Sequence, residues 1–260
     1  MAKVIAIINQ KGGVGKTTTA VNLSALLGAM GQRVLMIDLD PQGNTTSGLG
    51  MEVDDKSIYE VIMGRMKLTD VMEETEFKNL SIAGSDVRLA NAELELVEVE
   101  KREYRLKTAV QSVQQDFDFI FIDCPPSLGL LTINALGAAD SVLIPIQCEY
   151  YALEGVASLM NTISRVKKTI NPHLEIEGVL LTMLDGRTNL GLQVVDEVKK
   201  HFKKQVYATV IPRSDRLGEA PSHGEPIHVY DKRSAGCVAY VNLAKEVLKR
   251  NNIKVKEFKL

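Results

Sequence analysis

The feature that most constrains the fold is a glycine-rich segment near the N-terminus, NQKGGVGKTT at residues 9–18. An apolar, β-branched run at residues 4–8 leads into it, and a helical pattern at residues 17–30 follows it. In this strand–loop–helix setting, backbone N–H groups can surround an anion, and the helix N-terminus adds partial positive charge. The glycines permit backbone conformations and a close approach that larger residues would prevent. The segment therefore predicts a phosphate-binding loop rather than a turn that is merely rich in glycine.

The alternation of strand and helix continues along the chain. Nearly continuous apolar runs, as expected for parallel strands covered on both faces, lie at residues 4–8, 34–37, 80–83, 119–122, 142–146, 176–183 and 206–211. Helical patterns occupy residues 17–30, 153–169, 192–202 and 238–250, and the charged stretch 51–78 predicts short helices. The pattern predicts an α/β fold, a doubly wound, mostly parallel sheet flanked by helices, with ligands at the carboxyl ends of the strands. We expect a single domain over residues 1–260 with a frayed tail at residues 251–260.

Composition narrows the function classes. The formal net charge is −2, so binding of nucleic acid would have to come from a local basic patch. Trp is absent, which argues against a base-stacking platform. Cys124, Cys148 and Cys237 are far apart, which favours buried apolar residues over a disulfide or a zinc site. The sequence shows no signal peptide and no apolar run of the ~20 residues that a membrane span needs, so we expect a cytoplasmic protein.

The loop itself supplies candidate contacts to a nucleoside triphosphate. Lys16 is placed to bind β- and γ-phosphate oxygens, and the Thr17 hydroxyl to ligate Mg²⁺. The backbone groups expected to surround the phosphates belong to Gly12, Gly13, Val14, Gly15, Lys16, Thr17 and Thr18.

Three aspartates extend this site. Asp123 ends the buried run FIFID, where an acidic residue that senses Mg²⁺ is expected, and Asp38 and Asp40 lie in IDLDPQGN after the second strand. Two carboxylates beside a triphosphate are costly unless one faces the metal and the other a water molecule. We therefore assign Asp38 to the Mg²⁺ shell with Thr17 and Asp123, and Asp40 to orienting the attacking water.

One part of the loop departs from the usual phosphate-loop pattern. Gln10 stands where that pattern has a glycine, and an additional lysine, Lys11, follows it. Taken alone, Lys11 is equally consistent with a solvated loop lysine and with a charge directed at phosphate.

Longer segments carry a resemblance to a known family. KGGVGKTT, DLDPQGN and IDCPPSLGLLTINAL together look like the deviant Walker-A ATPases. PIQCEYYALEG, LLTMLDGRTNLG and IPRSDRLGEAPSHGEPI narrow the resemblance to the ParA/Soj chromosome- and plasmid-partitioning ATPases, over nearly the whole chain. This resemblance implies an ATPase that uses ATP and Mg²⁺ and forms a homodimer when ATP is bound, with two nucleotides at the interface.

The resemblance also implies a role for the additional lysine. In the family this residue, here Lys11, reaches the phosphates held by the partner subunit, as an arginine finger does in other ATPases. Lys11 would then be catalytic together with Lys16 and Asp40. Gly12 would lie where two backbones meet, so a side chain there would obstruct closure of the dimer.

Adenine contacts in the family come from the loop after the last strand. Carried over to this sequence, they are Pro212 and Ser214. Relatives often have Asn where Ser214 stands. A contact between the backbone of this residue and adenine would not depend on this difference, whereas a side-chain contact would.

Similarity to the family further implies DNA binding without sequence preference by the ATP-bound dimer. The matching positions are Arg187 and Arg216, and Lys245, Lys249 and Arg250 could extend a basic patch. A ParB-type centromere-binding protein is the implied partner and would stimulate turnover. We expect an ATPase switch of chromosome or plasmid partitioning that associates with the nucleoid when ATP is bound.

Two other function classes share the loop. A MinD-like membrane-associated division-site regulator would need an amphipathic C-terminal helix. Ile253, Val255, Phe258 and Leu260 do not form a clean helical stripe, which disfavours a membrane contact. A redox protein like the nitrogenase iron protein would need cysteines that bridge two subunits, and Cys124 has no cysteine to pair with it.

Overall fold

The structure, a computed structural model, describes residues 1–149, 155–185, 189–255 and 258. Its strands are β1 (Lys3–Ile7), β2 (Val34–Asp38), β3 (Met72–Glu74), β4 (Leu80–Ala83), β5 (Phe119–Asp123), β6 (Ser141–Gln147), β7 (Glu175–Leu184) and β8 (Val206–Pro212). Within the described residues they form one sheet in the order β3-β4-β2-β5-β1-β6-β7-β8. Neighbouring strands are parallel except for β3, which pairs antiparallel with β4. The predicted mostly parallel sheet is confirmed.

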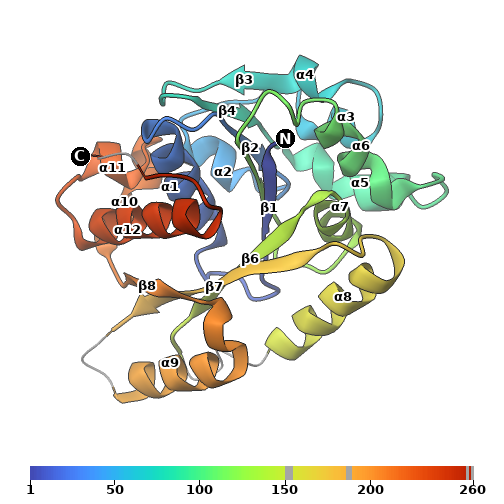
Figure 1. The fold of residues 1–260 in the computed structure, drawn as a ribbon. Helices are drawn as coiled ribbons and strands as arrows, with labels where there is room; N and C mark the ends of the chain where they lie inside the picture. The colour runs from blue at the N-terminus through green and yellow to red at the C-terminus, as the bar shows by residue number, and fades with distance from the viewer. Residues whose placement is uncertain (150–154, 186–188, 256–257, 259–260) are drawn as a thin grey trace.

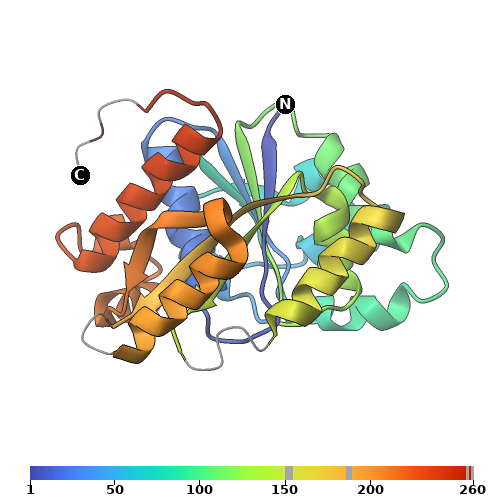
Figure 2. The same cartoon turned by 60° about the horizontal axis from the view of Figure 1, so that its bottom comes forward.

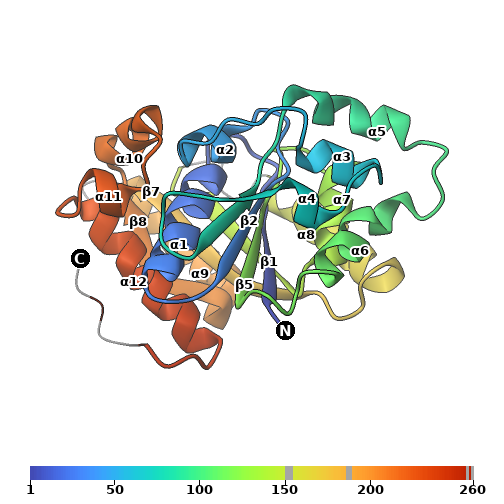
Figure 3. The same cartoon turned by 90° about the horizontal axis from the view of Figure 1, so that it is seen from above.

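Helices cover both faces of the sheet (Figures 1 and 3). The α-helices are α1 (Lys16–Ala29), α2 (Asn44–Gly48), α3 (Ile58–Ile62), α4 (Leu68–Val71), α5 (Ala92–Glu95), α6 (Arg105–Gln111), α7 (Leu130–Ala138), α8 (Val156–Thr169), α9 (Asn189–Phe202), α10 (Asp215–Glu219), α11 (Ile227–Tyr230) and α12 (Ala235–Arg250). Short 3₁₀ helices are η1 (Val87–Asn91), η2 (Arg102–Tyr104), η3 (Lys203–Gln205) and η4 (Ala220–His223). The α1 and α12 helices lie on one face of the sheet, and α6, α7, α8 and α9 pack on the other.

Strand β1 shows why the apolar runs are continuous. Val4 and Ala6 belong to the core cluster on the α6–α9 face, and Ile5 and Ile7 belong to the cluster on the α1–α12 face. Successive side chains of a strand point to opposite faces, so a strand covered on both sides needs an apolar residue at every position. Each of these four side chains is 0% exposed.

The strand register places the ends of three neighbouring strands together. Ile7 of β1 pairs with Asp123 of β5, and Asp38 of β2 pairs with the same aspartate. The chain passes from β1 into α1 at this carboxyl end of the sheet, which is the dark blue connection in Figure 2. In doubly wound sheets, ligands bind outside the carboxyl ends of the strands, close to where the strand order reverses.

One acidic side chain covers part of the sheet edge at β8. Half-buried Glu246 of α12 accepts hydrogen bonds from the backbone N–H of Ala208 (2.9 Å) and of Thr209 (3.0 Å). Arg250 lies 3.0 Å from the same carboxylate and stacks over the Tyr207 ring at 4.0 Å. Edge strands leave N–H groups free to pair with another chain, and Glu246 occupies two of them.

The structure adds elements to those that the sequence predicted. Stretch 51–78 contains the expected short helices α3 and α4, but it also contains β3, whose three charged or flexible residues gave no strand pattern. The α6 and α7 helices were not predicted, and α7 is apolar on nearly every face because it is largely buried. The three cysteines are buried and unpaired, as expected.

The segment after α12 contacts the body of the protein. Ile253, Val255 and Phe258 are half-buried and pack against the core cluster on the α1–α12 face. In the part of the chain that the structure describes, no helix is both long and apolar enough to cross a membrane.

Replacing Glu246 by Ala should lower the free energy of unfolding by about 1–3 kcal/mol, because two backbone N–H groups lose their acceptor and Arg250 loses its carboxylate partner. Urea unfolding at neutral pH measures this change. The matched control is Glu197→Ala, because the Glu197 side chain is 59% exposed in a surface pair with Lys200. Its effect should stay within about 0.5 kcal/mol. Equal effects of the two substitutions would show that Glu246 does not stabilise the β8 edge.

Candidate active site

The loop between β1 and α1 has the conformation that its glycines predict. Gly13 (φ 72°) and Gly15 (φ 88°) lie in the left-handed region, where other residues are strained, and α1 begins directly after Gly15. Among the described residues, no atom beyond the neighbouring residues lies within 4 Å of where a Cβ of Gly12 or Gly13 would project. The loop therefore presents open backbone, as close approach of a phosphate requires.

A buried threonine fixes the position of this loop. Thr182, on β7, donates a hydrogen bond of 2.8 Å to the Val14 carbonyl, and both residues are almost completely buried. Thr182 was not predicted as part of the site. It lies 168 residues from Val14, and its segment LLTMLDGRTNLG indicated the family but not this contact.

Lys16 is a buried cation with few partners. It is 7% exposed, and its Nζ donates to the Lys11 carbonyl at 3.3 Å. Burial lowers the pKa of Lys16, although the charges of Asp123 and Asp40 oppose this shift. A buried ammonium group is costly without an anionic partner. Phosphate oxygens beside the loop would supply that partner.

Asp123 sits next to the lysine with one oxygen unsatisfied. Its Oδ2 accepts hydrogen bonds from the hydroxyls of Thr17 (2.8 Å) and Thr45 (2.7 Å). Its Oδ1 is buried and has no hydrogen-bond partner within the described residues. Burial raises the pKa of Asp123 to about 6, and the two threonines and Lys16 reduce this rise. Carboxylate and hydroxyl oxygens suit Mg²⁺, so the orphaned oxygen and the Thr17 hydroxyl fit this ion.

Asp38 lies beside Asp123 but is already engaged. Its Oδ2 accepts from the backbone N–H (2.9 Å) and hydroxyl (2.7 Å) of Thr46, and its Oδ1 accepts from the Asp40 N–H (3.1 Å). Burial, and then the charge of Asp123, raise its pKa to about 7. Among the described residues, no three His, Cys, Asp or Glu side chains are grouped to hold a metal ion. Hydroxyls, phosphate and water would therefore complete the shell of an ion bound here.

Asp40 lies on the loop after β2, close to the surface. It is 8% exposed, and its Oδ1 accepts from the Gln42 N–H at 3.0 Å. The hydrogen bond from its own N–H to Asp38 fixes the backbone at this position. The carboxylate is therefore held at the same end of the sheet as Lys16 and Asp123.

Lys11 points away from the buried part of the loop. Its side chain is 39% exposed, and its Nζ lies 3.8 Å from Glu149 Oε2. Its backbone N–H donates to Asn9 Oδ1 (3.0 Å), and the Asn9 amide donates to the Pro145 carbonyl (2.7 Å). No role was predicted for Asn9, although it begins the loop segment, or for Glu149, which reaches the loop only through the folded sheet.

A cavity of about 400 Å³ opens beside the loop. Its lining brings the predicted Pro212 and Ser214 together with Gly15 and Thr18, and Glu149 and Thr182 also line it. Within the described residues, the Ser214 hydroxyl forms no hydrogen bond and does not cap the α10 helix that follows it. The cavity is large enough for the base and sugar of a nucleotide whose phosphates lie in the loop.

Of the two predicted DNA contacts, the structure describes Arg216, on the α10 helix. Arg187 lies outside the described residues. Arg216 is exposed and paired with Glu219 Oε2 (2.7 Å) and Asp231 Oδ2 (3.5 Å). The hydrogen bond from its guanidinium to Glu219 raises the pKa of Arg216. To bind a DNA phosphate, Arg216 would have to exchange one of these partners.

Comparisons with known proteins agree with this geometry. A family model described as an AAA domain matches residues 2–176. The sporulation initiation inhibitor protein Soj of Bacillus subtilis is 59% identical over 249 residues, which is 95% of this chain and 98% of Soj. The chromosome partitioning protein ParA of Myxococcus xanthus is 50% identical over 256 residues, covering 98% of this chain and 90% of ParA.

A solved structure shows the same fold with ligands. The cobyrinic acid a,c-diamide synthase of Mycobacterium smegmatis, crystallised with an ATP analog and magnesium, superimposes with a TM-score of 0.85. It is 37% identical, and the match covers 100% of both chains.

The buried charge of Asp123 leads to a prediction about stability. Asp123→Asn keeps an oxygen for the two threonine hydroxyls and removes a carboxylate whose pKa rises from 3.8 to about 6 on folding. Without nucleotide and Mg²⁺, this substitution should raise the free energy of unfolding at pH 8 by about 2 kcal/mol. Because the pKa of Asp123 is raised in the folded state, the unmodified protein loses stability as the pH rises. The stabilisation by Asp123→Asn should therefore be roughly half as large near pH 5 as at pH 8.

Urea unfolding at both pH values tests this prediction. The control is Asp54→Asn at an exposed aspartate, which should change stability by less than about 0.5 kcal/mol at either pH. A loss of stability in Asp123→Asn at pH 8 would contradict the inference that this carboxylate is held at a cost.

Proposed function

The chain belongs to the Soj and ParA family of partitioning ATPases, and we propose that it acts as a dimerising switch that binds DNA without sequence preference only when ATP is bound. It hydrolyses ATP to ADP and phosphate and uses Mg²⁺. Residues 1–260 would act as one ATPase unit in chromosome or plasmid partitioning. The proposed partners are a second copy of the chain, non-specific DNA and a ParB-type centromere-binding protein, with a cytoplasmic location and association with the nucleoid in the ATP state.

The proposed dimer is supported by the position of Lys11 and Gly12 on the open side of the loop. Lys16, not Lys11, is the lysine buried beside Asp123, and Lys11 pairs only loosely with Glu149. In the part of the chain that the structure describes, nothing beyond the neighbouring residues lies within 4 Å of a Cβ at Gly12. Lys11 is not needed by the site of its own subunit, and Gly12 is not needed by the fold of its own subunit. Both residues are explained if a second subunit closes on this face.

The residues of the site would divide the work of hydrolysis. Mg²⁺, when bound, neutralises charge on the phosphate oxygens, and Thr17 and Asp123 would hold it. Lys16 and the backbone N–H groups of the loop would hold the terminal phosphates in one orientation. Asp40 would orient the attacking water and accept a hydrogen bond from it. Lys11 of one subunit would place its charge on the phosphates held by the other.

The alternative, a MinD-like membrane-associated regulator, is less well supported. Ile253, Val255 and Phe258 would be the apolar residues of a membrane-binding tail, and they pack against the protein's own core. Flotation with liposomes in the presence of ATP is the direct comparison with DNA binding.

Gly12→Val tests the interface. The substitution should leave folding unchanged, because the described residues leave room for the side chain. It keeps the Gly12 backbone N–H, so the variant should still bind ATP, which is measured alongside. It should prevent dimer formation with a non-hydrolysable ATP analogue, measured by analytical ultracentrifugation. Lys16→Ala is the reference, because it should lose ATP binding itself. Normal dimerisation of Gly12→Val would place the interface elsewhere.

Asp40→Ala tests the switch. The variant should bind ATP with unchanged affinity and hydrolyse it at least about a hundredfold more slowly, because the water loses its orienting group. It should therefore sediment as a dimer with ATP and remain bound to DNA.

Combining Asp40→Ala with Arg187→Glu should keep the dimer and abolish DNA binding, which separates the two functions. DNA binding that persists in the double variant and weakens with salt would locate the basic patch elsewhere. Hydrolysis at the normal rate by Asp40→Ala would remove Asp40 from the mechanism.

A further inference from the structure

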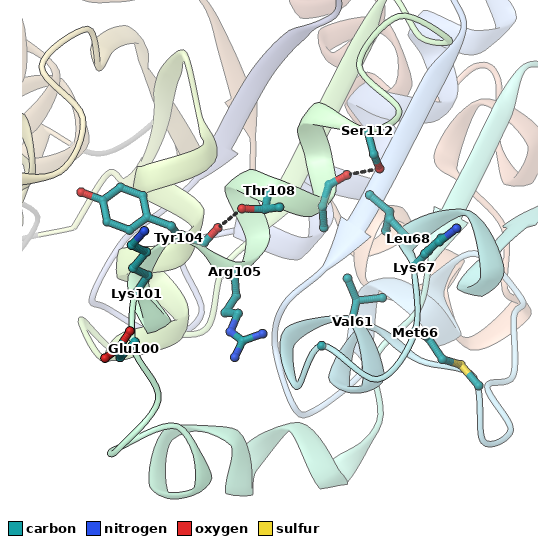
Figure 4. Close-up of a pocket in the computed structure, with 12 residues that line it drawn as sticks. Val61, Met66, Lys67, Leu68, Glu100, Lys101, Tyr104, Arg105, Thr108 and Ser112 are labelled. Carbon is teal, nitrogen blue, oxygen red and sulfur yellow. Dashed lines mark hydrogen bonds between the residues drawn. The ribbon is translucent and has the colours of Figure 1, made fainter.

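A second cavity, of about 570 Å³, lies apart from the phosphate loop, and none of the candidate site residues lines it. One wall is the segment from α3 to α4, and the other is η2 with α6 (Figure 4). Its apolar lining includes Val61 and Leu68, which belong to the core, and Ala109, which packs against it. The volume is within the range of small-molecule sites in proteins.

Arg105 is the distinctive residue of this cavity. It starts α6, it is half-buried, and its guanidinium forms no hydrogen bond or ion pair within the described residues. By contrast, Arg65 and Arg88 in the same region each form ion pairs with neighbouring carboxylates. The donors of this guanidinium are therefore free to bind an anionic partner.

A glycine makes room for this guanidinium. A Cβ at Gly64 would lie 2.5 Å from Arg105 Nη1, and Gly64 has a φ of +74°. Arg105 therefore lies directly over exposed backbone. Figure 4 shows its side chain leaving α6 toward the Val61 wall.

The charges around the cavity favour an anion. Lys67 and Lys101 are exposed on its lining, and neither forms an ion pair within the described part of the chain. Glu100 is the one acidic residue among the described residues that line it. Three cations against one carboxylate leave the cavity net positive.

Buried Asn134 of α7 holds one wall of the cavity in place. It accepts from the Leu106 N–H at 3.1 Å and donates to the Arg102 carbonyl at 2.9 Å, and it is 0% exposed. The start of α6, and with it Arg105, is therefore fixed before any ligand arrives, which lowers the entropic cost of binding.

We propose that this cavity binds a small amphipathic organic anion. Arg105 would hold its carboxylate or phosphate group as a two-pronged donor, with Lys67 and Lys101 at the rim. The apolar body of the ligand would rest on Val61, Leu68 and Ala109. This site is independent of the proposed switch, because it shares no residue with the nucleotide site.

The test uses three probes that separate charge from apolar contact. They are 4-phenylbutyrate, its neutral analogue 4-phenylbutan-1-ol, and inorganic phosphate. Binding is followed on the full-length protein by shifts of the assigned methyl signals of Val61, Leu68 and Ala109. We expect 4-phenylbutyrate to shift these signals with an affinity at least about tenfold higher than that of either other probe.

Two substitutions on α6 localise the charge. Arg105→Gln should weaken 4-phenylbutyrate binding at least about tenfold, since a charge-assisted bidentate contact is lost. Lys107→Gln removes a cation two residues away that does not line the cavity, and it should leave the affinity unchanged. Both variants should hydrolyse ATP at the normal rate, which verifies that they are folded.

Three results would overturn the assignment. These methyl signals could stay unshifted at about 10 mM 4-phenylbutyrate, a concentration that would saturate a millimolar site. The neutral analogue or phosphate could bind as tightly, which would leave a purely apolar crevice or a simple ion site. Arg105→Gln could retain normal affinity, which would exclude this arginine as the anion-binding group.

Discussion

The hydrogen bonds of Asp123 hold the functional end of this protein together. One oxygen of this carboxylate accepts from Thr17 at the start of α1 and from Thr45 in α2, so the end of β5 is tied to two helices at once. The neighbouring Asp38 fixes Thr46 and the backbone of Asp40 in the same way. Buried carboxylates thus help to position the loop after β2 and the start of α1. Any ion or phosphate that approaches meets groups whose places are already set.

Burying the carboxylates of Asp38 and Asp123 costs free energy. Two fully buried carboxylates on adjacent strands have raised pKa values, because burial disfavours their charged forms. The apolar core on both faces of the sheet stabilises the fold and offsets this cost. A nucleotide with its metal would relieve the unfavourable charge at Asp123 and Lys16 together. Ligand binding and stability are therefore coupled at the ends of β2 and β5.

The sequence predicts this site well where the residues are close together in the chain, and poorly where the fold brings them together. Lys16, Thr17 and the glycines follow from a strand, a loop and a helix that are consecutive, and Asp123 follows from its place at the end of a buried strand. Thr45, Thr182 and Glu149 lie on other elements, and no role at the nucleotide site was assigned to them, although Thr182 and Glu149 lie in segments that carry the family resemblance. The same holds for Glu246 at the β8 edge and for Arg105, since their importance depends on which strand or wall they face. The short β3 strand was missed because three charged or flexible residues carry no strand periodicity.

The open space beside Gly12 has a consequence for protein engineering. Its backbone is not in the left-handed region, and a methyl group there would touch none of the described residues beyond its chain neighbours. Glycine-to-alanine replacements at such positions usually stabilise a fold by about 0.4–1 kcal/mol, because the unfolded chain loses freedom. A thermostability screen would therefore reward the replacement of this glycine, while a screen for partitioning in cells would reject it if the proposed dimer closes here. Disagreement between two such screens would distinguish residues kept for assembly from residues kept for folding.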